Sequence, residues 1–370
     1  MKTIKSDFFK SKKEFIQTNF NKKKIDKTII NIAYFILFLG NIVVLSASYG
    51  ASKSYSVSAL FFFMKHVVFC IASIILIHIF AKQKNRLQNI GKFIWVLSII
   101  LLIVTLFLGS SVKGARRWIS FFGFSFQPSE LAKIGVLIQG SFNYKSLKNL
   151  LIIYMLPILL IIIQPDLGTS FVIMCLGLFQ VLIKNFKWKY IIIGILALIA
   201  LFFFAYFSFS HVQARIDAFF SVSDIYGKGY QKYKSYLAMK NGGFFGQGFG
   251  KGVIKDLLPD SHTDFIFSVV IEEFGILGGL CVIFSFIKLG LRALVLEPKN
   301  EYFKVVHNSV LFLITSQAWL NIASALSLIP TKGLILPLIS YGGSGLIVQG
   351  IAFGILLSVC EEKSKISLKN

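Results

Sequence analysis

The stretch Leu258–Phe267 (Leu-Pro-Asp-Ser-His-Thr-Asp-Phe-Ile-Phe) joins a long polar segment to a strongly apolar one. Asp264 is its last carboxylate, because the residues that follow, Phe265–Ile271, carry no charge. A carboxylate at the point where water gives way to hydrocarbon is a candidate functional residue. A structural interpretation is also open, since Thr263 or Asp264 suits the N-cap of the helix that follows.

The composition around this stretch is that of an integral membrane protein. Of 370 residues, 55% are hydrophobic and only 15% are charged, whereas soluble domains carry about a quarter charged residues. There are 39 Lys and Arg against 16 Asp and Glu, a net charge of +23. In a soluble protein this excess suggests nucleic acid, but here much of it flanks apolar segments. We therefore expect membrane lipids with anionic head groups as partners, and no nucleic acid.

Ten apolar segments are candidates to cross a bilayer, for which a helix needs about 20 residues. They are Ile29–Ser48, Leu60–Ala81, Phe93–Gly109, Ser129–Phe142, Leu150–Ile163, Leu167–Ile183, Tyr190–Ser210, Phe265–Ile287, Val305–Ile329 and Leu346–Cys360. Several are short, which predicts tilted or broken helices covered by protein. The fold class predicted is an all-α polytopic membrane protein with about ten transmembrane helices.

Basic residues occupy every second loop, and such loops are cytoplasmic. They include Lys82, Lys84 and Arg86; Lys145 and Lys148; Lys184, Lys187 and Lys189; Arg292, Lys299 and Lys304; and Lys363, Lys365 and Lys369. This predicts cytoplasmic N and C termini, with basic tails at 1–28 and 362–370 around a transmembrane domain at 29–361. The large loop 211–264, between the seventh and eighth helices, then lies outside, and loops of that length are usually functional.

A first polar cluster on the predicted outer side precedes the fourth helix. Pro128 suits the first turn of that helix, and Glu130 complements its dipole. Lys133 lies three residues further on, on the same helical face. One interpretation is a solvated loop followed by an internal Glu–Lys pair. The other is that Arg116, Arg117 and Lys133 bind phosphate, because the planar guanidinium group matches phosphate oxygens.

Three other outer segments carry turn residues. Asp166 follows Pro165 in a short turn, where it can cap the next helix and point into the bundle. The glycines of Asn241–Gly248 lack the Lys-Ser/Thr and the preceding strand of a nucleotide loop, so we expect sharp turns instead. The prolines and glycines of Pro330–Ser344 predict a re-entrant or broken segment beside a cavity.

Five motifs, in this order and spacing, resemble the SEDS family of polytopic membrane proteins. They are Gly114–Ile119 (Gly-Ala-Arg-Arg-Trp-Ile), Gln127–Glu130 (Gln-Pro-Ser-Glu), Gln164–Gly168 (Gln-Pro-Asp-Leu-Gly), Leu258–Phe267 and Ile339–Ser344 (Ile-Ser-Tyr-Gly-Gly-Ser). The resemblance covers nearly all of residues 29–361. Lys113–Trp118 and Pro330–Leu334 look more like the cell-division branch of the family than the elongation branch. Asp260, where the family often has Glu, and Gly345, where it often has Ser, are departures.

The resemblance implies a peptidoglycan glycosyltransferase that polymerises lipid II, the undecaprenyl-pyrophosphate-linked disaccharide-pentapeptide. It implies ten transmembrane helices in the bacterial inner membrane, with the reaction at the outer face of the division septum. A class B penicillin-binding protein and other division-machinery proteins are the implied partners. The resemblance makes Asp264 the catalytic residue. The candidate substrate-binding residues on the family motifs are Arg116, Arg117, Gln127, Glu130, Lys133, Asp166 and Lys332.

The chemistry expected from these residues is proton removal and charge stabilisation. Asp264 is the candidate base for the sugar hydroxyl, and Arg117 and Lys133 are candidates to stabilise the leaving pyrophosphate. We expect no tightly bound cofactor; a divalent cation, Mg or Mn, is compatible with this role, although the sequence shows no ligand cluster for one. A lipid II flippase, an elongation-type polymerase and a non-enzymatic scaffold are the alternatives.

Overall fold

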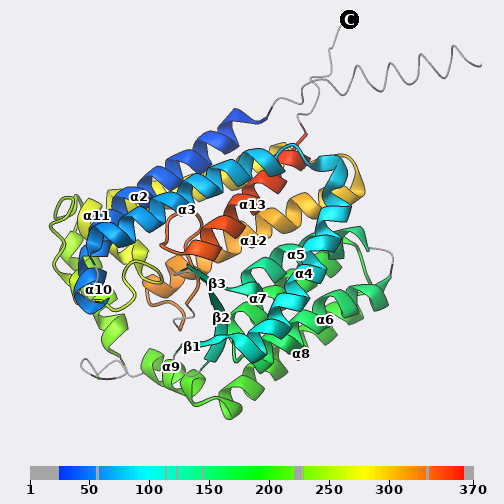
Figure 1. The fold of residues 1–370 in the computed structure, drawn as a ribbon, viewed down its shortest axis with the longest axis horizontal. Coiled ribbons are helices and arrows are strands. Elements are labelled where there is room, and N and C mark those ends of the chain that lie inside the picture. The colour runs from blue at the N-terminus through cyan, green and yellow to red at the C-terminus, as the bar shows by residue number, and fades with distance from the viewer. Residues whose placement is uncertain are drawn as a thin grey trace, which may run out of the picture.

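The computed structural model describes residues 25–55, 58–112, 115–121, 124–143, 146–220, 227, 229–330 and 333–361. Within these ranges the chain is mostly helical, and α2, α3 and the C-terminal α13 lie side by side in one bundle (Figure 1). The predicted tail 362–370 and nearly all of the predicted tail 1–28 lie outside the described residues.

Each of the ten predicted apolar segments coincides with a helix. These helices are α2 (Lys27–Tyr55), α3 (Ala59–Phe80), α4 (Leu87–Leu108), α5 (Pro128–Phe142), α6 (Leu147–Ile163), α7 (Leu167–Ile183), α8 (Trp188–Ser208), α11 (Ile266–Val295), α12 (Glu301–Ala325) and α13 (Gly343–Val359). Among the described residues, α2, α3, α4, α8 and α11 are long and apolar enough to cross a membrane, and α6, α7 and α13 are shorter apolar helices.

At one end of the bundle, ion pairs hold each end of the described chain to another element. Arg292, near the C-terminal end of α11, bonds to Asp26, which lies just before α2. Lys84, in the short 3₁₀ helix η1 (Lys84–Arg86), bonds to Glu361, which lies just after α13. This end therefore carries two of the basic loops that the sequence predicts to be cytoplasmic.

A small antiparallel sheet, which the sequence did not predict, lies between α4 and α5. Its strands β1 (Ser110–Val112), β2 (Ala115–Phe121) and β3 (Phe124–Phe126) pair in the order β1-β2-β3. Since successive side chains of a strand point to opposite faces, neighbouring residues of β2 have different surroundings. Arg116 is exposed, and Arg117 is half-buried. The sheet thus decides which of the two arginines faces the bundle.

The large loop is itself folded and docks on a kink in α11. It contains α9 (Ser210–Phe220), α10 (Tyr230–Gly242) and the 3₁₀ helix η2 (Ile254–Asp256). At the kink Gly275 has φ 70° and ψ −171°, a conformation that favours glycine. A Cβ atom on Gly246, in the docked turn, would lie 2.1 Å from the Glu273 carbonyl oxygen. The glycines therefore form close turns, as predicted.

The segment between α12 and α13 is a broken segment, as predicted. Residues 333–342 contain no helix, yet Leu334, Leu336 and Leu338 are buried. A Cβ atom on Gly40 of α2 would lie 2.8 Å from the Leu338 carbonyl oxygen, so α2 covers this backbone closely. Protein rather than lipid surrounds the non-helical residues, as their unpaired backbone groups require.

Candidate active site

The segment that ends at Asp264 is fixed to the broken segment by hydrogen bonds to its backbone carbonyl groups. The hydroxyl of Ser340 donates to the Thr263 carbonyl at 2.7 Å, and the Tyr341 N–H donates to the His262 carbonyl at 2.9 Å. From α12, the Asn321 amide donates to the Asp264 carbonyl at 3.0 Å and also bonds to the broken segment. Residues 77 positions apart in the chain are thus joined in one hydrogen-bonded unit.

The carboxyl group of Asp264 lies beside the start of the broken segment. A Cβ atom on Gly333 would be 3.3 Å from Asp264 Oδ2. The N-cap of α11 is Phe265, so neither Thr263 nor Asp264 caps this helix and the capping interpretation is wrong. Asp264 is half-buried at the end of α11. Lys332, the candidate cation that precedes Gly333 in the sequence, lies outside the described residues.

Aromatic rings enclose His262, two residues before the candidate base. The ring centroid of His262 is 5.4 Å from that of Tyr341 and 6.4 Å from that of Phe62. Burial lowers the pKa of His262, and the nearby carboxylate of Asp260 opposes this effect only in part. His262 is therefore neutral at pH 7, and it packs as a ring beside the site.

Arg117 binds the turn between α6 and α7. Its Nε donates to the Gln164 carbonyl at 3.3 Å, and its Nη2 donates to the Pro165 carbonyl. Burial lowers the pKa of Arg117, the positive charge of Arg215 adds to this effect, and Asp166 opposes it. The guanidinium nevertheless stays charged, and it places a cation at the turn that begins α7.

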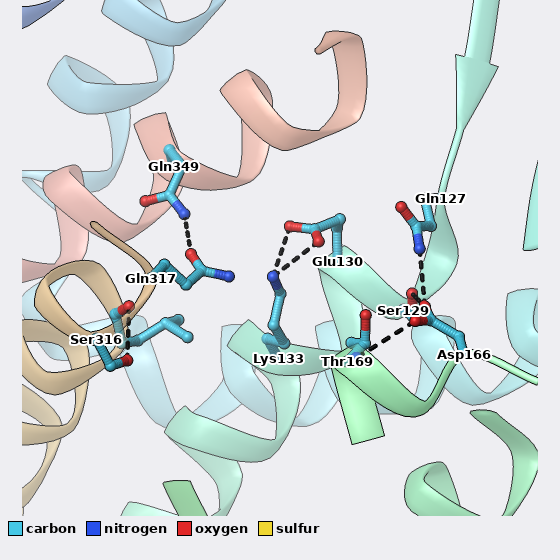
Figure 2. Close-up of polar contacts among 10 residues, drawn as sticks. Gln127, Ser129, Glu130, Lys133, Asp166, Thr169, Ser316, Gln317 and Gln349 are labelled. Atoms are coloured by element: carbon cyan, nitrogen blue, oxygen red, sulfur yellow. Dashed lines mark hydrogen bonds and ion pairs between the residues drawn. The ribbon is translucent and has the colours of Figure 1, made fainter. Parts of the chain in front are cut away.

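Asp166 both caps α7 and points into the bundle, as the sequence predicted. Its Oδ1 accepts the Thr169 N–H at 3.3 Å. Its Oδ2 accepts the Gln127 amide at 2.8 Å and the Ser129 hydroxyl at 3.1 Å (Figure 2). The side chain is 7% exposed. Asp166 therefore links the start of α7 to the start of α5.

Glu130 and Lys133 form an ion pair inside the bundle. Lys133 Nζ lies 2.8 Å from Glu130 Oε1 and 2.7 Å from Oε2 (Figure 2). The Lys133 side chain is 1% exposed. The internal pair that the sequence left open is thus present. An arriving anion has to compete with Glu130 for Lys133, because two buried charges stay paired unless a third group replaces one.

A second buried ionic group, which the sequence interpretation missed, holds the large loop on α11. Glu272 accepts the backbone N–H groups of Ile254 at 2.8 Å and Lys255 at 2.9 Å. Glu273 accepts the Lys255 ammonium at 2.5 Å and the Ser46 hydroxyl of α2. The available signal was two consecutive glutamates inside a predicted transmembrane segment, which are functional candidates by default.

Six of the eight predicted site residues fall into three groups of contacts at the end of the bundle opposite Arg292. Arg117, Gln127 and Asp166 meet at the α6–α7 turn, and Glu130 with Lys133 forms the second group. Asp264 belongs to the third, with the broken segment. Arg116 is exposed on the other face of β2. Among the described residues, no group of three or more His, Cys, Asp or Glu side chains suits a metal ion.

Comparison with known proteins decides the family. The family model FTSW_RODA_SPOVE, described as "Cell cycle protein", matches residues 26–365. The chain belongs to this family. The match confirms the resemblance of its motifs to SEDS proteins, and it covers every described site residue discussed above.

Proteins named as peptidoglycan glycosyltransferases are similar to the chain. The probable peptidoglycan glycosyltransferase FtsW of Buchnera aphidicola is 32% identical over 93% of this chain and 96% of its own length. The peptidoglycan glycosyltransferase MrdB of Escherichia coli K12 is 33% identical over 75% of this chain and 79% of its own length.

Two solved structures of the same fold extend the comparison. A structure titled as a peptidoglycan synthase complex that coordinates polymerization and crosslinking matches 91% of this chain and 98% of that chain, with a TM-score of 0.72 and 23% identity. Thermus thermophilus RodA matches 92% of this chain and 97% of its own, with a TM-score of 0.67 and 23% identity. At 23% identity, this likeness shows only that the chain has the fold of these structures.

Proposed function

We propose that this protein is a peptidoglycan glycosyltransferase that polymerises lipid II, with Asp264 as its general base. The observation that carries the proposal is the similarity to glycosyltransferases of this name over more than nine-tenths of the chain. The fixed position of Asp264 at the end of α11 supports it. The names of the relatives give no support to a flippase or a scaffold.

The reaction joins two sugars and releases a lipid pyrophosphate. The acceptor 4-hydroxyl attacks the anomeric carbon of the donor, its proton passes to the Asp264 carboxylate, and the bond to the pyrophosphate breaks. A single displacement of this kind inverts the anomeric carbon. General-base help of this kind contributes roughly 10²–10⁴-fold to a rate. Because the backbone at Thr263 and Asp264 is held from α12 and the broken segment, the position from which the carboxyl group projects is fixed before substrate binds.

The cations stabilise the charge that develops on the leaving group. Arg117 uses two of its five N–H donors on backbone carbonyls, and the others can reach pyrophosphate oxygens. Lys133 contributes when the pyrophosphate replaces one of its contacts with Glu130. Gln127, Asp166, Arg116 and Lys332 complete the proposed substrate-binding set. Mg or Mn bound with the pyrophosphate would supply further positive charge at these oxygens.

In the cell we place the protein in the bacterial inner membrane with ten spans and both termini in the cytoplasm. The reaction then occurs at the outer face, and the partner is a class B penicillin-binding protein that crosslinks the product strands. A role at the division septum, with other division proteins, is supported by FtsW relatives that align over 93% of the chain, against 75% for MrdB.

The test is polymerisation of labelled lipid II by the purified full-length protein and its partner in proteoliposomes. We expect Asp264→Asn to lower the rate by about 10²-fold or more. Asp260→Asn is the matched control, because it changes a carboxylate of the same segment and asparagine tolerates its φ of 55°. A folded Asp264→Asn protein that polymerises at the wild-type rate refutes the assignment of the base.

A further inference from the structure

Polar contacts between α2 and α11 mark two levels along the bundle. The Arg292–Asp26 ion pair joins the helices at one level, and the Ser46–Glu273 hydrogen bond joins them at the other. The two contacts are about 20 residues apart from Asp26 to Ser46 and from Glu273 to Arg292, which is roughly 30 Å at 1.5 Å per helical residue. The hydrocarbon core of a bilayer has the same thickness, about 30 Å. The spacing of the two contacts therefore matches the spacing of the two boundaries of the hydrocarbon.

The exposure of α11 gives the same boundary independently. From Ile266 to Gly275 its side chains are buried, except for the partly exposed Phe274. From Ile276 onward one face is exposed and apolar, as at Phe284, which is 61% exposed. Since α11 has 30 residues and is about 45 Å long, one end must extend beyond the hydrocarbon. The buried end is the one suited to extend beyond the hydrocarbon, and the exposed apolar face that suits lipid begins at the kink.

A turn of the large loop docks at this level. The Ile276 N–H donates to the Gly243 carbonyl at 3.0 Å, and the Leu277 N–H donates to the Phe244 carbonyl at 3.4 Å. The turn displays three aromatic side chains: Phe244 is 55% exposed, Phe245 is 77% exposed and Phe249 is 49% exposed. Exposed apolar groups gathered in one place mark an interaction surface.

Two lysines flank these rings. Lys240, at the end of α10, and Lys251, just after the turn, are both exposed. Aromatic rings with neighbouring lysines are typical of segments at the membrane interface, where the rings enter the glycerol region and the ammonium groups reach phosphates.

We propose that the turn Phe244–Phe249 inserts into the interfacial region of the phospholipid leaflet on the candidate-site side. Phe244, Phe245 and Phe249 enter the leaflet, and Lys240 and Lys251 bind lipid phosphates. The turn contacts the backbone of Glu272 and Glu273, whose side chains hold Ile254 and Lys255. Insertion of the turn therefore sets the depth, relative to the bilayer, of the segment from Ile254 to Asp264. This inference is independent of the glycosyltransferase reaction.

The test measures the depth of the turn in the full chain reconstituted in phospholipid nanodiscs. A nitroxide is attached through Phe245→Cys in a protein whose two incompletely buried cysteines, Cys175 and Cys281, are replaced by serine. Its accessibility to oxygen, which enters lipid, is compared with its accessibility to Ni-EDDA, which stays in water. Phe284→Cys on the exposed face of α11 is the lipid control, and Lys299→Cys in an exposed loop is the water control.

We expect the label at 245 to favour oxygen several-fold more than the label at 299, and to lose this preference when amphipol replaces the bilayer. A label at Phe249→Cys should behave in the same way and guards against a local defect at 245. Accessibility at both sites equal to that at 299 in nanodiscs would overturn the proposal. Protection of both sites from both reagents would also overturn it, because protein and not lipid would then cover the turn.

Discussion

Ion pairs at the two ends of the bundle use the same residue types in different surroundings. At the end that holds the described termini, the Lys84 and Glu361 side chains are 24% and 32% exposed. At the site end, Lys255 and Glu273 are 2% and 0% exposed, and Lys133 and Glu130 are 1% and 11% exposed. Water screens the first pair, whereas the buried pairs bear a desolvation cost. The costly charges thus lie at the same end of the bundle as the candidate active site.

The largest effect is expected from breaking the Lys255–Glu273 pair. Lys255→Met leaves Glu273 buried without its cation, and removing one partner of a buried pair costs about 3–5 kcal/mol. The double variant Lys255→Met with Glu273→Gln should recover most of this loss, because no buried charge remains. Denaturation in mild detergent, followed by tryptophan fluorescence, measures both. If Lys255→Met is as stable as the wild type, burial of this ion pair does not determine its contribution to stability.

Breaking the Lys133–Glu130 pair separates stability from activity. Lys133→Met should destabilise the protein by about 3 kcal/mol or more, and addition of Glu130→Gln should restore much of the loss. Lipid II polymerisation should stay low in both, because the cation for the pyrophosphate is absent. If the stable double variant polymerises lipid II normally, Lys133 has only a structural role.

Gly333→Ala tests the space beside the candidate base. At φ 66° a side chain costs about 1–2 kcal/mol, and the added Cβ atom would lie 3.3 Å from Asp264 Oδ2. We expect polymerisation to fall about tenfold, from displacement of the carboxyl group. Gly290→Ala is the matched control, since nothing lies within 4 Å of its added Cβ atom and alanine favours the helix. Equal activity of the two variants would argue against this crowding.

A smaller effect is expected from pH at His262. Its pKa is lowered in the folded state, so the unfolded chain takes up the proton more readily. The stability that the neutral ring contributes is therefore complete above the unfolded pKa of about 6.5 and is lost as the pH falls below it. Thermal unfolding between pH 7.5 and 5 should show this decline, and His262→Gln should reduce it. An unchanged slope in the variant would assign the decline to other groups.

The smallest effect is expected at the partly exposed Lys84–Glu361 pair. Lys84→Ala removes a pair worth about 0–1 kcal/mol and a ring contact with Phe303, at 4.6 Å from the ring centroid. The change in stability should shrink further in high salt, and polymerisation should stay at the wild-type level. If Lys84→Ala lowers the stability as much as Lys255→Met does, exposure does not explain the difference between the ion pairs at the two ends.

The helices and the site differed in how well the sequence predicted them. The ten apolar segments were located to within a few residues at most ends, because runs of hydrophobic residues are local features. The cap and the inward direction of Asp166 followed from its place after Pro165. The sheet at β1–β3 was missed, because strand pairing depends on a partner segment. The N-cap at Phe265 was misassigned, because Thr263 bonds to Asp260 instead.

The sequence by itself determined the membrane class, the helices and the family, since hydropathy, basic loops and motifs are properties of neighbouring residues. Only the tertiary structure decided which charges are buried and what they contact. Ser46 reaches Glu273 across 227 positions, and Ser340 reaches Thr263 across 77. Burial and pairing at such separations arise from the packing of α2, α11 and the broken segment. For the charged Glu273, the cost of an isolated buried charge makes a partner necessary.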